Sequence, residues 1–273
     1  MPSLFPVLDP AGAIGAAERG LMLHAVEFML IVAIPVYILL FFFAYKYRVG
    51  NKKAKYAPDV EHGKLEELVW WVVPLEIVLV LGALTWGSTH QLDPKRALEG
   101  GPPLQVQVVA LDWKWLFIYP EQGIATVNYL VMPVDKPVRF SITADAPMNS
   151  FWIPQLGGQI YAMTGMVTEL NLVANEPGVY KGAGANYSGD GFAKMKFVAS
   201  AVATEDFDAW VAGIKAATST LSFGDYQELA RPTIDAAPSY FAQVEPGLFD
   251  AVMMQFMDSV KGSAPHGADA HSH

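Results

Sequence analysis

Four carboxylates lie inside or at the edge of the two most apolar stretches of the chain. Glu27 and Glu76 lie within these stretches, and Glu66 and Glu67 lie just before the second one. Ionisable groups in lipid are costly and usually functional, and a carboxyl group there can bind and transfer protons. For Glu27 and Glu76 three states remain open: a protonated carboxyl, a mutual hydrogen bond, or polar partners on another subunit. His24 lies one helical turn before Glu27 and is a candidate partner for that carboxyl.

Metal chemistry is restricted by the residue types that the sequence lacks. A binuclear copper centre for electron transfer needs soft thiolate and imidazole ligands, and the chain contains no cysteine. Three of its histidines, His266, His271 and His273, fall in a tail rich in Gly, Ala and Ser. We expect this tail to be disordered and without function, with chelation of a stray ion as the alternative. The sequence therefore excludes a thiolate-bridged copper centre.

Two long apolar runs predict membrane spans. The chain is 52% hydrophobic, too apolar for an average soluble domain, yet it is too charged beyond residue 88 to lie wholly in lipid. The runs Leu21–Ala44 and Leu68–Trp86 each approach the roughly 20 residues that a bilayer core requires. Both must be helical, because lipid offers the backbone no other partner. The alternative, two buried helices of a large soluble protein, is disfavoured by the apolar run Phe28–Phe43.

Charge predicts the orientation of these spans. The connection between them is rich in Lys and Arg and is therefore expected in the cytoplasm, with Lys46, Arg48, Lys52, Lys53, Lys55 and Lys64. The N-terminal segment and everything after Gly87 are then external. From Ser88 onward 11 Lys and Arg stand against 19 Asp and Glu, a net charge of −8, which argues against a nucleic-acid partner. No signal-peptide pattern precedes the first span, so either this span directs its own insertion or the natural leader is not in this sequence; lipidation is not predicted.

The external part combines strands with helices. From residue 104 to residue 201 apolar side chains alternate along short segments separated by turn residues such as Asn175-Glu-Pro-Gly178, a pattern typical of half-buried strands in a β-sandwich. Beyond it, the spacing of apolar residues predicts helices over 205–216, with Thr204 as N-cap, and over 247–260.

Two loops of the external part resemble the copper-ligand loops of subunit II of the haem-copper respiratory oxidases. The copper-bearing members read roughly His-Ser-Trp in one loop and Cys-x-Glu-x-Cys-Gly-x-x-x-His-x-x-Met in the other, with small variation in spacing within the family, so the second loop is matched by its flanking Gly-Val-Tyr and its terminal methionine. Here the first loop reads Met148–Pro154, and the second lies within Gly178–Met195. By this resemblance most ligand positions hold residues that do not bind copper: Asn149 and Phe192 for the histidines, Gly184 and Ser188 for the cysteines and Asn186 for the glutamate, while Met195 remains.

The loss of the copper ligands points to the quinol-oxidising branch of the family, and Asp112–Asn128 is similar to the cytochrome bo-type ubiquinol oxidases in particular. The resemblance covers about residues 8–257. It implies a non-redox subunit of a proton-pumping quinol oxidase that reduces oxygen to water. It places the haems, the catalytic copper and the quinol site in subunit I, with further small subunits and lipid as partners. This chain is then part of an enzyme of the inner membrane without being the catalyst.

The resemblance also implies a role for Glu67. The arrangement Glu67-x-x-x-Trp71-x-x-Pro74 is similar to that of the family's glutamate at the mouth of a proton-uptake path into subunit I. Glu66 is the alternative, and an ordinary solvated helix end is the plain interpretation. Trp113 and Trp115 fall in the segment that forms the electron-entry patch in the cytochrome c-oxidising branch. Without copper below them, we interpret both as aromatic residues of the core and of the interface with subunit I.

These observations predict a membrane-anchored α+β chain with a two-helix transmembrane hairpin, a cupredoxin-like β-sandwich and C-terminal helices. We expect an external N-terminal segment (1–20), the hairpin (21–87) with its cytoplasmic loop (45–66), a linker (88–103), the cupredoxin-like domain (104–201), C-terminal helical segments (202–261) and the tail (262–273). A cytochrome c oxidase subunit II is excluded by the missing ligands. The remaining alternative is a free-standing, membrane-tethered binding module. Ubiquinol and menaquinol cannot be distinguished as substrates of the complex.

Overall fold

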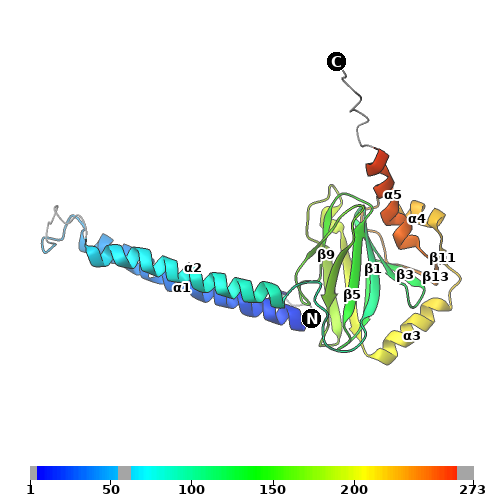
Figure 1. Cartoon of the computed structure of the whole chain (residues 1–273), viewed down its shortest axis with the longest axis horizontal. Coiled ribbons are helices and arrows are strands. Elements are labelled where there is room, and N and C mark those ends of the chain that lie inside the picture. Colours follow the sequence, from blue (N-terminus) through cyan, green and yellow to red (C-terminus); the bar gives the residue numbers. More distant parts are fainter. Residues whose placement is uncertain (1–4, 55–62, 263–273) are drawn as a thin grey trace, which may run out of the picture. The chain divides into compact units, whose positions relative to one another are not determined.

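The computed structural model describes residues 5–54 and 63–262 and is shown in Figure 1. The chain divides into two compact units: Met1–Glu18 together with Pro94–His273, hereafter the head, and Arg19–Asp93, hereafter the hairpin. Residues 263–273 of the predicted tail and residues 55–62 of the predicted cytoplasmic loop lie outside the described residues.

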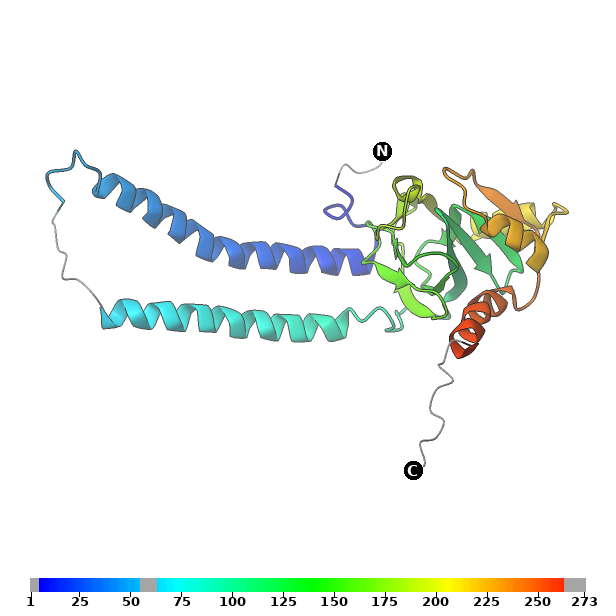
Figure 2. The ribbon, with the colours of Figure 1, turned by 90° about the horizontal axis from the view of Figure 1, so that it is seen from above.

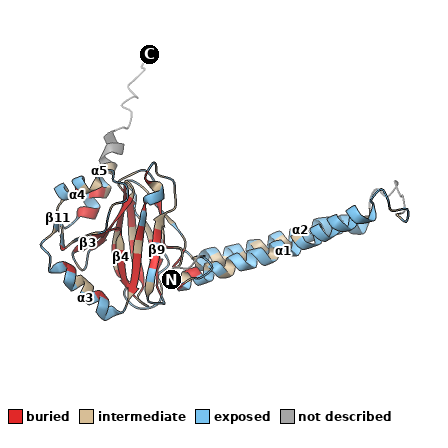
Figure 3. Cartoon of the chain, turned by 180° about the vertical axis from the view of Figure 1, so that it is seen from behind, coloured by how far each residue is buried: buried red, intermediate tan, exposed pale blue. Residues whose placement is uncertain are grey.

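The hairpin consists of two helices, α1 (Ala13–Lys46) and α2 (Lys64–Gln91), which run alongside one another in Figure 2. Both are long and apolar enough to cross a membrane, which confirms the two predicted apolar helices. Each extends beyond its apolar run at both ends. Neither candidate span buries any side chain within the chain, as the pale-blue helices of Figure 3 show. Their surfaces are therefore available to lipid or to other subunits.

Two sheets form the sandwich of the head. The first has six strands in the order β12-β3-β2-β1-β5-β8, with bounds Ser239–Phe241, Ile124–Val127, Lys114–Tyr119, Leu104–Leu111, Val138–Ala144 and Thr168–Leu172. The second has five strands in the order β4-β10-β9-β6-β7, with bounds Tyr129–Pro133, Lys196–Val202, Gly178–Gly184, Asn149–Trp152 and Ile160–Ala162. Most pairs are antiparallel, but β1–β5 and β4–β10 are parallel, so strands distant in the sequence become neighbours.

Aromatic rings fill the space between the sheets. Phe151 lies at their centre and contacts four of them, with centroid distances of 5.3 Å to Trp115, 6.2 Å to Phe117, 5.3 Å to Phe140 and 5.1 Å to Phe197. All five side chains are at most 3% exposed. Their burial supplies much of the hydrophobic stabilisation of the head.

The expectation of half-buried strands is wrong for β2, in which all six residues are buried. Trp115 and Phe117 face the core between the sheets, whereas Leu116 and Ile118 face a second apolar cluster. That cluster is completed by Leu221, Tyr226, Leu248, Phe249 and Val252 from the C-terminal part of the chain. The six-stranded sheet is thus covered on both faces, because the C-terminal elements pack on the face that the alternation assigned to solvent.

The C-terminal part contains more than the two predicted helices. It forms α3 (Thr204–Lys215), α4 (Phe223–Ala230) and α5 (Leu248–Gly262). A two-stranded sheet joins β11 (Thr220–Leu221) to β13 (Gln243–Val244), and β12 pairs with β3. The predicted N-cap Thr204 is wrong: the cap is Ala203, without a side-chain hydrogen bond. Ser222 instead caps α4 through a reciprocal capping box with Asp225.

The first described residues belong to the head. The Ala11 and Gly15 amides donate to the Gln155 and Leu156 carbonyls (2.8 and 3.0 Å), and the Asn175 amide donates to the Ala11 carbonyl (2.8 Å). The Gly158 amide donates to Glu18 Oε1 (2.9 Å), and Ile14 lies against Gly157. Residues 11–18 therefore complete a part of the head that is formed by residues some 140 positions later in the chain.

Candidate functional site

The positions that resemble copper ligands meet at one end of the five-stranded sheet. Asn149 begins β6, Gly184 ends β9, and Ser188 and Met195 lie in and after the following loop. The Asn149 amide nitrogen Nδ2 donates to Ser188 Oγ (2.8 Å) and to Met195 Sδ (2.9 Å). Its Oδ1 accepts from the Ser150 amide (2.7 Å). Both amide hydrogens of Asn149, which is 1% exposed, are thus used within the head.

These residues do not fit a copper ion. The cluster offers one thioether, one hydroxyl and one amide, whereas copper centres of this kind need thiolates and imidazoles. The space is also filled, since a Cβ atom added at Gly184 would lie 2.6 Å from Asn149 Oδ1. A cysteine at this position would require the Asn149 side chain to move. Within the described residues no group of three or more His, Cys, Asp or Glu is placed to hold a metal ion.

The two other positions of the resemblance lie outside this hydrogen-bonded set. Asn186 Nδ2 donates to the Met148 carbonyl (3.0 Å), which ties the second loop to the first. Phe192 begins a 3-10 turn, Phe192–Lys194, and its ring packs edge-on against Tyr187 at 5.7 Å. The structure thus gathers Asn149, Gly184, Ser188 and Met195 and leaves Asn186 and Phe192 at the rim.

Trp113 contacts the loop that contains Ser188, Gly189 and Gly191. Its Nε1 donates to the Ser188 carbonyl (3.0 Å), and its ring occupies the place that a Cβ atom at Gly191 would take. Its backbone adopts a left-handed conformation, with φ 64°, uncommon for a bulky residue. This Trp113 contact was missed from the sequence, although Gly189 and Gly191 were a signal for a close approach. Trp115 instead lies wholly in the core, at 0% exposed.

Glu27, Glu66, Glu67 and Glu76 of the hairpin are all exposed. Glu67 lies in the first turn of α2, where its amide donates to the Gly63 carbonyl (3.0 Å). The Glu66 carboxylate folds back over the same Gly63, where it occupies the space of a Cβ atom.

Within the described residues, Glu27 is hydrogen-bonded to neither His24 nor Glu76. The His24 ring bonds through Nδ1 to the Gly20 carbonyl at 2.7 Å, and no hydrogen bond from His24 to Glu27 occurs within the described residues. Within the described parts of the chain, no hydrogen bond joins Glu27 to Glu76. The remaining states are a protonated carboxyl or a partner on another subunit.

A partly buried polar cluster fastens the C-terminal elements to the sandwich, and it was not predicted from the sequence. Tyr226 of α4 donates its hydroxyl to Asp145 Oδ2 at 2.5 Å. Lys114 Nζ donates to the Arg231 carbonyl (2.7 Å) and to Thr233 Oγ1 (3.0 Å). Each bond links positions more than 80 residues apart, so only the fold could reveal the cluster.

Burial changes the acidity of these groups. It raises the pKa of the Tyr226 hydroxyl, and the hydrogen bond to Asp145 raises it further. Burial lowers the pKa of Lys114, and Asp112 opposes that shift. The pKa of Asp112 is raised by burial and by the Asp145 charge, against the effect of Lys114. Each shift follows from desolvation, which disfavours the charged form.

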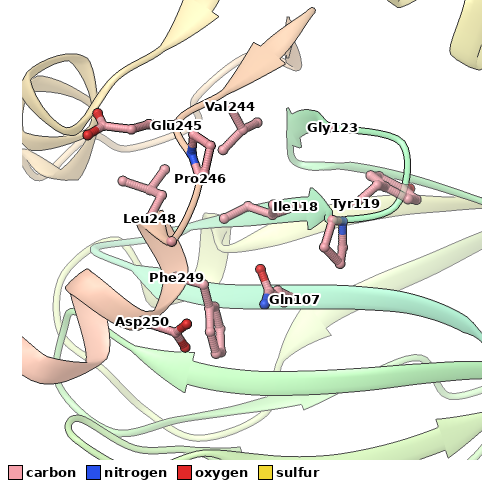
Figure 4. Close-up of a pocket in the computed structure, with 12 residues that line it drawn as sticks. Gln107, Ile118, Tyr119, Gly123, Val244, Glu245, Pro246, Leu248, Phe249 and Asp250 are labelled. Carbon is pink, nitrogen blue, oxygen red and sulfur yellow. The ribbon is translucent and has the colours of Figure 1, made fainter.

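A hollow of about 330 Å³ lies on the face of the six-stranded sheet that the C-terminal elements cover (Figure 4). Gln107 and Ile118 form its base, and the segment Val244–Asp250 forms its wall. Glu245 accepts from the Phe223 amide (2.6 Å). Since Ile118 faces the C-terminal cluster, this hollow lies across the sheet from the core between the two sheets.

Comparison with known protein families agrees with this architecture. The family model "Cytochrome C oxidase subunit II, periplasmic domain" matches residues 120–202, and the "COX Aromatic Rich Motif" matches residues 215–259. The second match contains α4 and most of α5. The head is therefore a subunit II domain of the cytochrome oxidase type, extended by the aromatic-rich motif.

Relatives that match nearly the whole chain are subunit 2 proteins of quinol oxidases. The chain is 50% identical to cytochrome bo(3) ubiquinol oxidase subunit 2 of Pseudomonas aeruginosa, over 97% of this chain and 80% of the relative. It is 36% identical to quinol oxidase subunit 2 of Bacillus subtilis, over 97% of this chain and 78% of that relative.

Among solved structures, the periplasmic domain of subunit II of the Bradyrhizobium japonicum cytochrome oxidase is 24% identical, with a TM-score of 0.39, over 40% of this chain and 91% of that structure.

The chain belongs to the family of quinol oxidase subunit 2 proteins. It is thus a subunit of an oxidoreductase complex, and the predicted fold class is confirmed. Two candidate transmembrane helices and a periplasmic domain fit an inner-membrane protein.

Proposed function

We propose that this chain is the non-redox second subunit of a proton-pumping ubiquinol oxidase that reduces oxygen to water. In this proposal it anchors and caps subunit I, which holds the haems, the catalytic copper and the ubiquinol. Glu67 receives protons at the cytoplasmic side. Further small subunits and lipid cover the remaining surface of the hairpin.

The observation that carries the non-redox role is the closed hydrogen-bond set of Asn149. Its amide already bonds Ser188 and Met195, so the place of a metal is occupied by protein contacts. The donor atoms are also the wrong type for copper. Electrons from quinol therefore have no carrier in the cluster that replaces the copper centre.

The face of α2 favours Glu67 over Glu66 as the proton-entry group. With 100° per residue, Glu67 lies about 20° from Pro74 around the helix, whereas Glu66 lies about 80° away. Trp71, four residues after Glu67, shares its side. The Glu66 carboxylate is turned back over Gly63. Glu67 therefore has the expected spacing from Pro74, and its exposed side chain is available to a neighbouring subunit.

The orientation follows from charge. Lys46, Arg48, Lys52 and Lys53 border the connection between α1 and α2, and such clusters stay in the cytoplasm. Glu67 begins α2 close to this connection. Both termini are then periplasmic, and Glu67 faces the compartment from which protons are taken.

The test is oxygen uptake by the complex purified with this chain in its wild-type and Glu67→Gln forms. Glutamine keeps the size of the side chain but cannot ionise. We expect quinol-driven oxygen uptake to fall by about tenfold, equivalent to about 1.4 kcal/mol on the rate-limiting barrier, with an unchanged haem spectrum. Glu66→Gln is the matched control and should retain most of the activity.

Two results would contradict the proposal. Full activity of Glu67→Gln together with a loss in Glu66→Gln would move the proton-entry role to Glu66. A stable, colourless chain that purifies from its native membrane without companion subunits would instead support the free-standing binding module.

A further inference from the structure

We propose that the side of α1 that bears Glu27 binds a transmembrane helix of a companion subunit, and that this helix donates a hydrogen bond to the Glu27 carboxyl. The inference rests on membership of an oxidase complex. It does not depend on the proton-entry role of Glu67, which lies on the other helix.

The groove between the two helices identifies the inner side of α1. This apolar groove of about 710 Å³ is lined by seven residues of α1, with Met29, Val32 and Val36 near the middle of that set and Phe28 and Tyr37 at its edges, and by Ile77 and Leu81 from α2. Residues at these positions on α1 therefore point toward α2. The opposite side of α1 is exposed among the described residues of the hairpin.

Glu27 lies on that opposite side. Around the helix it is about 160° from Met29, 140° from Val32 and 180° from Val36. Its side chain is exposed and does not line the groove. Glu27 therefore points away from the groove between the helices.

The carboxyl of Glu27 also lacks a partner along α1. Within the described residues, the nearby imidazole of His24 bonds the Gly20 carbonyl through Nδ1, and no hydrogen bond to Glu27 occurs. Glu27 lies about 9 Å along the helix from Leu21, where the apolar run begins. A carboxyl at such a depth is costly in lipid and normally pairs with a polar group.

The same side of α1 continues as an apolar stripe. Ile31, Ile34 and Ile38 follow Glu27 at intervals of four, three and four residues and are 62%, 51% and 62% exposed. Together they extend the surface over about 16 Å. Lipid chains would cover the isoleucines equally well, but they cannot supply a hydrogen-bond donor to the carboxyl. The combination favours a protein helix with a hydroxyl, amide or cationic side chain at the level of Glu27.

The first test uses the absence of native cysteine. A single cysteine is placed at Ile31→Cys, on the proposed contact side, or at Val32→Cys, on the groove side, and is labelled with a photoreactive maleimide in the intact complex. We expect adducts with a companion subunit from position 31 and several-fold fewer from position 32. Equal or absent adducts at position 31 would overturn the proposal.

The second test measures the half-life of haem retention on the tagged chain in detergent. Glu27→Leu removes the hydrogen bond and should shorten it by about threefold to tenfold, the range for one interhelical hydrogen bond. Glu27→Gln keeps an acceptor and should remain near wild type. Unchanged retention in Glu27→Leu would mean that lipid or water surrounds Glu27. Failure of the Glu67 proposal would appear separately, as unaltered turnover in Glu67→Gln with intact haem retention.

Discussion

Polar side chains of the head and carboxyl groups of the hairpin differ in whether they have hydrogen-bond partners within the chain. In the head, the buried Asn149 amide, the Lys114 ammonium and the Tyr226 hydroxyl all find partners within the chain. In the hairpin, the carboxyl groups of Glu27 and Glu76 have no hydrogen bond within the described residues, and the candidate spans bury none of their side chains. These three polar groups of the head are therefore bonded within the chain, whereas the two carboxyl groups of the hairpin are left exposed on its surface.

This difference assigns separate roles to the two units. Variants in the head should change its own stability and leave haem retention intact as long as it stays folded. Variants on the hairpin, such as those at Glu27 and Glu67, should change assembly or turnover and leave the stability of the head unchanged. Three head variants test this separation.

The largest effect is expected from Phe151→Ala. Phe151 is fully buried and contacts four other rings, so truncation leaves a cavity at the centre of the sandwich. We expect the free energy of unfolding of the head to fall by about 3–5 kcal/mol, measured by denaturant titration with tryptophan fluorescence. Tyr161→Ala, at a site 48% exposed, should change it by less than about 0.5 kcal/mol. A loss similar to that of Phe151→Ala at this exposed site would contradict the assignment of the core.

A smaller effect is expected from Tyr226→Phe. The substitution removes the 2.5 Å hydrogen bond and leaves Asp145 without this donor, at a cost of about 1–3 kcal/mol. The C-terminal elements should loosen first, so limited proteolysis should cut the region 215–259 faster while the sandwich core remains resistant. Phe223→Leu, which keeps an apolar side chain beside Tyr226, is the control. Equal cleavage rates for wild type and Tyr226→Phe would show that the cluster does not fasten these elements.

The smallest effect concerns pH. Burial, with the nearby Asp145 charge, raises the pKa of Asp112, so the folded head holds this proton to a higher pH than the unfolded chain does. The resulting stabilisation is present below the ordinary value of 3.8 and is lost as pH rises through the raised native value. We expect this decrease, measured in unfolding titrations from acid to neutral pH, to be absent in Asp112→Asn. Parallel stability curves for the two proteins would contradict the shift.

The sequence was sufficient for the features that depend on local pattern. Apolar run length predicted both helices of the hairpin, and alternation predicted strands such as β1 and β5. The Asn149 cluster was expected from the loop resemblance, and four of its six positions lie together. These features are encoded within short segments or within motifs of fixed spacing.

The features that were missed depend on distant contacts. Nothing in the spacing around β2 indicates that α4 and α5 cover its second face, or that Tyr226 meets Asp145. The helix α4 had a local signal, the Ser222-x-x-Asp225 capping box, which was overlooked. Thr204 was wrong as a cap because a good capping residue one position inside the helix gives the same sequence pattern.

The attachment of residues 11–18 to the head has a practical consequence for making this domain on its own. A fragment beginning at Pro94 would leave the Gln155 and Leu156 carbonyls without their donors and would uncover Gly157 where Ile14 now lies. A soluble version of the head therefore needs residues 5–18 as well. They could be supplied in a circularly permuted chain in which a flexible linker joins them to the C-terminal elements.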